Sequence, residues 1–285
     1  MSIDPIQTFT QTIETQKSVA LTQLNTWTQT PATLKRPVFF VPGWTDDICK
    51  GWTIGYSRLN TPMQDWADKI FTNPNLGYFI NFSKADSDSC DSFLDYSKIL
   101  RERIWRLVGR DQPFDILGHS MGGLDIRAAI IDEKDPLLNV NNCLLVAAPN
   151  EGSQWGDLCQ AHLIRDPRKL TDAQVRQGVN MDPDHPIIQA INQVKVKREF
   201  LKNINKLYTL RGWKDTAGFS SSRFTYSGME QEFPGKVTEI NYDGTTHTGR
   251  NGITQDPRVT TDIVKILTDI PMAENRLNYG NEIKN

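Results

Sequence analysis

The 285-residue sequence has no apolar run of the length that a membrane-spanning helix needs. Its first residues also lack the basic start and the continuous apolar segment of a secretory signal, so we expect a cytoplasmic protein. No cluster of basic residues with interleaved aromatics is present, and the formal net charge is −2. This charge gives no reason to expect binding to nucleic acid.

Cysteine is scarce, and the four residues are Cys49, Cys90, Cys143 and Cys159. Their spacing is not that of a zinc site. Asp46 and Asp47 are adjacent acidic residues, but a metal site would need more oxygen ligands at matched spacing. We therefore expect no metal and no cofactor. Cys143 lies in an apolar segment, which favours a buried thiol there and reduced cysteines over disulfides.

Apolar strand patterns alternate with helical patterns along most of the chain. The predicted strands are 38–41, 77–82, 114–118, 143–148, 206–210 and 236–240. The predicted helices are 4–28, 62–71, 92–108, 122–133 and 259–269. In the helix 92–108, Phe93, Tyr96, Leu100, Ile104 and Leu107 form the expected inward stripe. Because most strands are apolar on both faces, we expect an α/β fold whose mostly parallel sheet is flanked by helices.

The alternation is interrupted between the fourth and fifth predicted strands. Residues 150–206 are polar, and apolar residues return with helical spacing only at 187–205. We therefore expect a helical cap or lid insertion, whose mobility the sequence leaves open. The predicted units are an N-terminal helical segment packed on the core (1–36), the core (37–153 and 206–270), the cap (154–205) and a polar tail (271–285).

The segment Gly-His-Ser-Met-Gly-Gly, residues 118–123, is the strongest motif of the chain. It follows the apolar run 114–117 and precedes a helical pattern. A serine between glycines, with a strand before it and a helix after it, is typical of a nucleophile elbow. Glycine is expected at the two flanking positions, 118 and 122, because a side chain there would collide with neighbouring backbone. Ser120 is thus a candidate nucleophile.

A serine nucleophile needs a base within hydrogen-bond reach, and histidine is the natural choice near neutral pH. The four histidines are His119, His162, His185 and His247. His119 adjoins the serine and should point away from its hydroxyl, while His162 and His185 belong to the predicted cap. His247 follows the last predicted strand. Because loops after the carboxyl ends of parallel strands meet at one edge, we expect His247 to be the base.

The carboxylate that orients the base should follow the preceding strand, and Asp215 lies in that loop. Asp243 remains a rival because it precedes His247 by four residues, although Asp-Gly at 243–244 is also an ordinary turn signal. The expected oxyanion donors are two backbone N–H groups. One belongs to Met121, after the nucleophile, and the other to Trp44, in the loop after the first strand.

With these segments the chain resembles the α/β-hydrolase superfamily, in its lipase and esterase branch. The matching segments are FFVPGW (39–44), DILGHSMGG (115–123), LLVAAPNEGS (144–153) and DGTTHTG (243–249). The resemblance covers about residues 37–270. It implies Ser120 as nucleophile, His247 as base, an acid matched here to Asp215, and an oxyanion hole at Trp44 and Met121. The chain departs from many relatives in having Pro42-Gly43 where they carry His-Gly.

The hypothesis from sequence is a serine carboxylic-ester hydrolase, a lipase or esterase that forms an acyl-enzyme. An acyltransferase with the same triad and a non-catalytic binding protein of this fold remain alternatives. Trp44, Trp213 and Phe219 are candidate substrate-binding aromatics and favour an apolar small-molecule or lipid ester. A lipid substrate would bring transient contact with a membrane or micelle. The acyl-chain length and the oligomeric state are left open.

Overall fold

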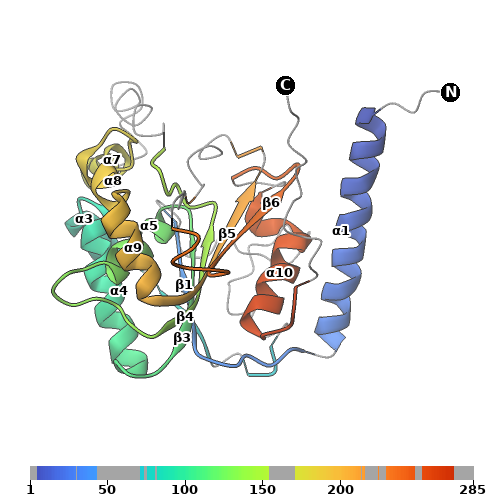
Figure 1. Ribbon diagram of the computed structural model, residues 1–285, viewed down its shortest axis with the longest axis horizontal. Helices are drawn as coiled ribbons and strands as arrows, with labels where there is room; N and C mark the ends of the chain where they lie inside the picture. Colours follow the sequence, from blue (N-terminus) through green and yellow to red (C-terminus); the bar gives the residue numbers. More distant parts are fainter. Residues whose placement is uncertain are drawn as a thin grey trace.

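The computed structural model describes residues 5–29, 31–43, 71–73, 76–80, 82–153, 171–212, 214–215, 224, 229–247 and 252–272. A six-stranded sheet lies at its centre, with the strand order β2-β1-β3-β4-β5-β6 (Figure 1). Every pair of neighbouring strands is parallel. The strands are β1 (Val38–Val41), β2 (Gly77–Phe79), β3 (Phe114–His119), β4 (Val140–Val146), β5 (Ile204–Gly212) and β6 (Val237–Tyr242). The α/β fold class with a parallel sheet is confirmed.

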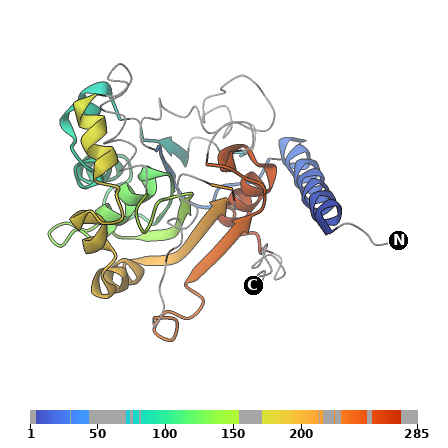
Figure 2. The ribbon, with the colours of Figure 1, turned by 90° about the horizontal axis from the view of Figure 1, so that it is seen from above.

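Helices cover both faces of this sheet. The helices described before β4 are α1 (Pro5–Gln29), α3 (Lys84–Ser89), α4 (Phe93–Val108) and α5 (Met121–Ile130). Those after it are α7 (Asp172–Val179), α8 (Pro186–Ile191), α9 (Val194–Lys202), the short 3₁₀ turn η2 (Ile253–Gln255) and α10 (Pro257–Leu267). The helices α4, α5 and α9 lie on one face and α10 on the other, with α1 outside α10 (Figures 1 and 2).

The alternation of side chains along the strands explains this arrangement. Leu144 packs in the cluster that contains Val259 and Ile263 of α10, whereas its neighbour Leu145 packs with Leu100 of α4. Successive residues of a strand point to opposite faces, so a strand that is apolar throughout can fill two cores. The buried cores on both sides of β4 account for the continuous apolar segment found in the sequence.

The predicted helix 92–108 is α4, but one part of its inward stripe is wrong. Phe93, Leu100 and Ile104 are buried as expected, whereas Leu107 is 50% exposed. The buried stripe advances four residues from Ile104, so that Val108 packs against the core instead. The predicted helix 62–71 lies outside the described residues, except for Phe71.

The described residues between β4 and β5 include the short helices α7, α8 and α9 (Figure 1). Thr171 and Gln174 form a capping box that begins α7, and Pro186 occupies the first turn of α8. The chain folds back over α4 and α5 there, where Ile188 and Ile191 of α8 share a buried cluster with Phe93. The helical spacing predicted at 187–205 thus belongs to two helices and the start of β5.

Cys90 and Cys143 are buried free thiols, as expected for Cys143, while the other two cysteines lie outside the described residues. Burial raises the pKa of Cys90 to about 11. Within the described ranges no helix is both long and apolar enough to cross a membrane.

Candidate active site

Ser120 stands at the turn between β3 and α5 with a strained backbone. Its φ and ψ are 53° and −130°, a conformation that a residue with a side chain rarely adopts. Two backbone hydrogen bonds hold it there, from Ser120 N–H to the Val146 carbonyl at 3.0 Å and from Gly123 N–H to the Ser120 carbonyl at 3.0 Å. The turn directs the serine outward at the N-terminal end of α5, which carries partial positive charge.

The glycines of this turn are required by close packing. A Cβ atom on Gly118 would lie 2.7 Å from the backbone of Gly122, and one on Gly122 would lie 2.3 Å from the Pro42 carbonyl oxygen. No real Cβ atom tolerates such contacts with backbone. The expectation that a side chain at either flanking glycine, Gly118 or Gly122, would collide with backbone is confirmed. The second contact also shows that the loop after β1 lies against the start of α5.

Ser120, His247 and Asp215 form a continuous chain of hydrogen bonds. The distance from His247 Nε2 to Ser120 Oγ is 2.9 Å, and that from His247 Nδ1 to Asp215 Oδ2 is 2.8 Å. The Asp215 side chain is fully buried, whereas that of His247 is 19% exposed. A buried carboxylate on Nδ1 fixes the tautomer in which Nε2 can accept a proton from the serine.

The loops after β5 and β6 meet by direct backbone contact. Lys214 N–H donates to the Thr245 carbonyl at 2.8 Å, and the Thr245 hydroxyl donates to the Tyr242 carbonyl at 2.8 Å. Gly212 faces Thr245 so closely that a Cβ would lie 2.7 Å from the threonine hydroxyl. These contacts bring Asp215 beside His247.

A buried ion pair holds the turn that precedes His247. Arg258 donates to Asp256 at 2.7 Å, and it also donates to the backbone carbonyl of Asp243 at 2.7 Å. Burial raises the pKa of Asp243. Gly244 completes the turn with φ 79°. The structure thus brings Asp215 and not Asp243 to the imidazole of His247.

The remaining histidines have other surroundings. His119 is buried and its ring centroid lies 5.1 Å from that of His247. His185 caps α8 through its Nδ1, which accepts the Ile187 N–H at 3.3 Å. His162 lies outside the described residues. Among the histidines that the structure describes, His247 is the one that is hydrogen-bonded to Ser120.

Of the two expected oxyanion donors, Met121 is the first residue of α5. Trp44 lies just past the end of the described segment 31–43. The three aromatics expected to bind substrate, Trp44, Trp213 and Phe219, also lie outside the described residues. The acyl pocket therefore stays an expectation from sequence. No group of three or more metal-ligating side chains occurs in the part of the chain that the structure describes.

Asp125 and Arg127, the two charged residues of α5, are both buried. All ten residues of α5 are buried, because α5 lies between the sheet and the helices α7 to α9. Arg127 donates to the carbonyls of Asn150 at 2.7 Å and of Ile191 at 2.9 Å. Burial lowers the pKa of Arg127 to about 10, so the guanidinium stays charged at neutral pH. This residue ties the elbow helix to the loop after β4 and to α8.

Asp125 is fully buried, and neither carboxyl oxygen has a hydrogen-bond partner in the described structure. Burial raises its pKa well above the ordinary value, so the folded protein keeps a proton that the unfolded chain releases above pH about 4. Stability conferred by this proton is present at low pH and is lost as the pH rises toward the folded-state pKa. As the pH rises above about 4, the free energy of unfolding of the native protein should fall relative to that of Asp125→Asn, by up to about 1.4 kcal/mol per pH unit.

Urea unfolding of both proteins at pH 5 and pH 8 measures this effect. Asp88→Asn, at an exposed position of α3, serves as the matched control and should show the same difference from the native protein at both pH values. A difference between native protein and Asp125→Asn that does not change with pH would contradict the protonated state of Asp125.

No protein-family model matches the sequence, and no curated protein matches it. Solved structures match its fold. Phospholipase PlaB from Legionella pneumophila, in complex with thio-NAD, is 11% identical with a TM-score of 0.57 over 85% of this chain and 60% of that one. Lipase BlEst2 from Bacillus licheniformis, in its mature form, is 16% identical with a TM-score of 0.50 over 85% and 94% of the two chains. This chain thus spans less than two thirds of the length of PlaB, and the likeness is one of fold.

Proposed function

This chain has the α/β-hydrolase fold, and on that premise we propose that it is a serine hydrolase of carboxylic esters. The observation that carries the proposal is the hydrogen-bonded chain from Ser120 through His247 to Asp215. It stands at the carboxyl ends of the strands, where open parallel sheets bind their ligands. The strained backbone of Ser120 further supports a functional role, because such strain persists where the surroundings enforce it.

In the proposed first step, His247 Nε2 takes the proton of the Ser120 hydroxyl as its oxygen attacks the ester carbonyl carbon. The bond that forms is Ser120 Oγ–C, and the carbonyl oxygen becomes an oxyanion. His247 then gives its proton to the alkoxide that leaves, so that an alcohol departs and an acyl-enzyme remains. The buried carboxylate of Asp215 stabilises the imidazolium between these transfers.

The proposed oxyanion donors are the backbone N–H groups of Met121 and Trp44. The position of Met121 at the N-terminal end of α5 supports its part, because the free N–H groups of a helix start favour negative charge. Contact between Gly122 and Pro42 supports the other, because it brings the loop that leads to Trp44 against this turn. Each donor is typically worth about 3 kcal/mol of transition-state stabilisation.

In the second half of the proposed reaction, His247 removes a proton from water as the water oxygen attacks the acyl-enzyme. The Ser120 Oγ–C bond breaks, the serine recovers its proton from His247, and a carboxylic acid leaves, which then releases its proton to the solvent. We propose lipase or esterase substrates with an apolar acyl group. The names of PlaB and BlEst2, a phospholipase and a lipase, favour this substrate class.

A fluorophosphonate probe tests the proposal directly. It reacts with a serine only where a base activates the hydroxyl, so we expect one adduct per chain, located at Ser120 by peptide mass spectrometry. Heat-unfolded protein is the control, since the base and the serine are then separated and labelling should be lost. Absence of an adduct on the folded protein, or an adduct at another residue such as Ser153, would refute the assignment.

Ester turnover by unlabelled protein, and its loss after labelling, separates hydrolysis from a binding function of the fold. Rates with p-nitrophenyl esters of increasing acyl length, with and without detergent micelles, then give the substrate class. A jump in rate above the micelle threshold is expected of a lipase, and smooth kinetics on short chains are expected of an esterase.

A further inference from the structure

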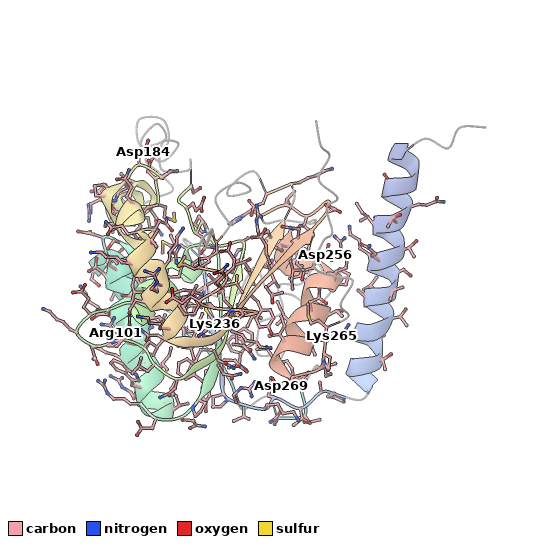
Figure 3. The ribbon with its side chains drawn as sticks, in the orientation of Figure 1. Arg101, Asp184, Lys236, Asp256, Lys265 and Asp269 are labelled. Carbon is pink, nitrogen blue, oxygen red and sulfur yellow. The ribbon has the colours of Figure 1, made fainter. Side chains whose placement is uncertain are left out.

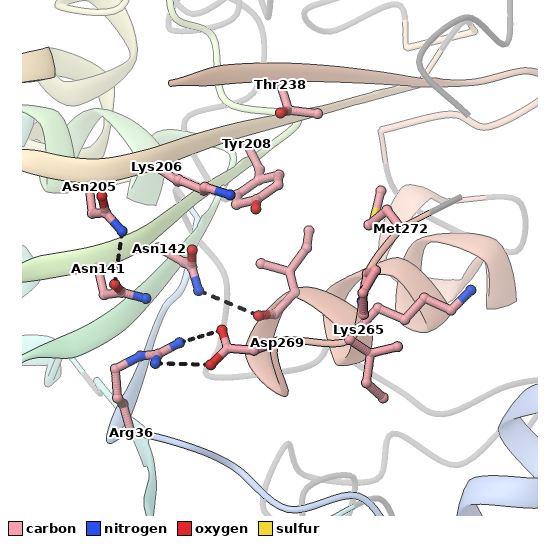
Figure 4. Close-up of a pocket in the computed structure, with 13 residues that line it drawn as sticks. Arg36, Asn141, Asn142, Asn205, Lys206, Tyr208, Thr238, Lys265, Asp269 and Met272 are labelled. Atoms are coloured by element: carbon pink, nitrogen blue, oxygen red, sulfur yellow. Dashed lines mark hydrogen bonds and ion pairs between the residues drawn. The ribbon is translucent and has the colours of Figure 1, made fainter. Parts of the chain in front are cut away.

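A cavity lies at the edge of the sheet opposite to Ser120 and His247. Its volume is about 600 Å³, within the range of small-molecule sites. It is bounded by the amino ends of β4, β5 and β6 and by the end of α10, near Asp269 (Figures 3 and 4). Asp256, at the other end of α10, belongs to the turn that holds His247 (Figure 3). A ligand in this cavity would therefore leave the candidate active site open.

One wall of the cavity is a rigid network of polar groups. Arg36 donates through Nε to buried Asp115 at 3.2 Å, and its two terminal nitrogens bind Asp269 at 3.1 and 2.8 Å (Figure 4). Asn141 Nδ2 also donates to Asp115 at 3.2 Å, and Asn205 Nδ2 donates to Asn141 at 3.1 Å. The network fixes the wall before any ligand arrives, which lowers the entropy cost of binding.

Three donors on the sheet face this cavity with no partner among the described residues: the Lys206 ammonium and the hydroxyls of Tyr208 and Thr238. Lys206 and Tyr208 are two residues apart on β5, and Thr238 of β6 is the strand partner of Tyr208. All three side chains therefore point to the face of the sheet that α10 covers. Figure 4 shows the Lys206 and Tyr208 side chains extending beside each other above Asn142. Burial raises the pKa of Tyr208, so its hydroxyl stays protonated and can donate.

The cations that line the cavity favour an anionic group on its ligand. They are Arg36, which two carboxylates already bind, together with Lys206 and Lys265. Lys265 extends away from the donors in Figure 4, which leaves Lys206 as the cation beside them. One ammonium and two hydroxyls match the two oxygens of a carboxylate better than a phosphate dianion.

The opposite wall is apolar. Ile266, Ile270 and Met272 line it, at and beyond the end of α10. A ligand that satisfies both walls has a charged end and an apolar tail. We propose that this cavity is a binding site for a small organic carboxylate with an aliphatic tail, held by Lys206 and Tyr208 at its charged end. The site is separate from the proposed ester-hydrolase centre and does not depend on that function.

Isothermal titration with hexanoate tests the proposal on the full chain. We expect saturable binding with a Kd below about 1 mM for the native protein. Hexanol keeps the tail without the charge, and inorganic phosphate keeps charge without the tail, so each should bind at least tenfold more weakly. Lys206→Gln should weaken hexanoate binding at least tenfold, and Tyr208→Phe about fivefold through loss of one hydrogen bond.

Lys195→Gln is the matched control, because Lys195 is an exposed lysine of α9 that does not line the cavity. It should bind hexanoate as the native protein does. The proposal is overturned if native protein shows no saturable heat up to about 10 mM hexanoate. It is equally overturned if Lys206→Gln binds as tightly as native protein, since hexanoate would then sit elsewhere, or if hexanol binds as well as hexanoate.

Discussion

Ser120→Ala is expected to lower kcat for a p-nitrophenyl ester by about a millionfold, the loss typical of removing a serine nucleophile. The oxyanion donors and bound substrate would remain, but no group could form the acyl-enzyme. The fold should persist, because Ser120 contributes one side-chain hydrogen bond, worth about 1 kcal/mol. Steady-state kinetics and thermal unfolding of the same preparation measure both effects.

Ser153→Ala is the matched control for this variant. Ser153 is also a buried serine that follows a strand of the sheet, but its N–H donates to the Met181 carbonyl at 2.7 Å and no glycine elbow surrounds it. Its replacement should change kcat by less than about tenfold. If Ser153→Ala abolished turnover while Ser120→Ala retained it, the proposed nucleophile would be wrong.

Asp215→Asn is expected to lower kcat by about 10⁴-fold at neutral pH. The amide can donate to His247 Nδ1, and the imidazole then carries its proton on Nε2, where it cannot accept one from Ser120. The 2.8 Å contact between Asp215 and His247 is the geometric basis of this expectation. Fluorophosphonate labelling should slow with kcat, because the same base activates the serine for both reactions.

Asp243→Asn is the comparison that this chain itself offers. The contact of Asp243 with Arg258 is through its backbone carbonyl, which the substitution retains. We expect kcat within about tenfold of the native value. The reverse ranking of the two variants, measured on one ester at one pH, would transfer the role of the acid to Asp243.

The three members of the proposed triad could be predicted from sequence because topology converts strand order into proximity. Ser120, Asp215 and His247 each follow the carboxyl end of a strand, and parallel strands bring those ends to one edge. The glycines at 118 and 122 added a local signal, since the turn has no room for a Cβ. The choice between Asp215 and Asp243 needed coordinates. Asp215 lies in the loop after β5 and Asp243 in the loop after β6, and both loops end at the same edge of the sheet.

The short helix α3 was missed because its six residues, KADSDS, have no apolar period. A capping box of Ser83 and Asp86 stabilises its N-terminal end, and Arg103 of α4 forms an ion pair with Asp86 at 2.7 Å. A serine followed three residues later by an acidic residue is a local start signal that could have indicated it.

Burial of Asp125 and Arg127 could not be predicted, since charged residues are mostly exposed unless paired. Their burial depends on the helices after β4 folding back over α5, which no local pattern encodes. The cavity was equally hidden from sequence reasoning. Its lining comes from segments between Arg36 and Met272, and the register of β5 and β6 places Thr238 beside Tyr208.

The distance along the chain between Ser120 and His247 has a consequence for biosynthesis. Their hydrogen bond spans 127 residues, and synthesis of that stretch takes roughly 6 to 25 s at ordinary rates of translation. Until β6 and the loop after it emerge from the ribosome, Ser120 lacks the imidazole of His247. A growing polypeptide thus carries the elbow for many seconds before the proposed base is synthesised, and the hydrogen-bonded chain of Ser120, His247 and Asp215 forms only afterwards.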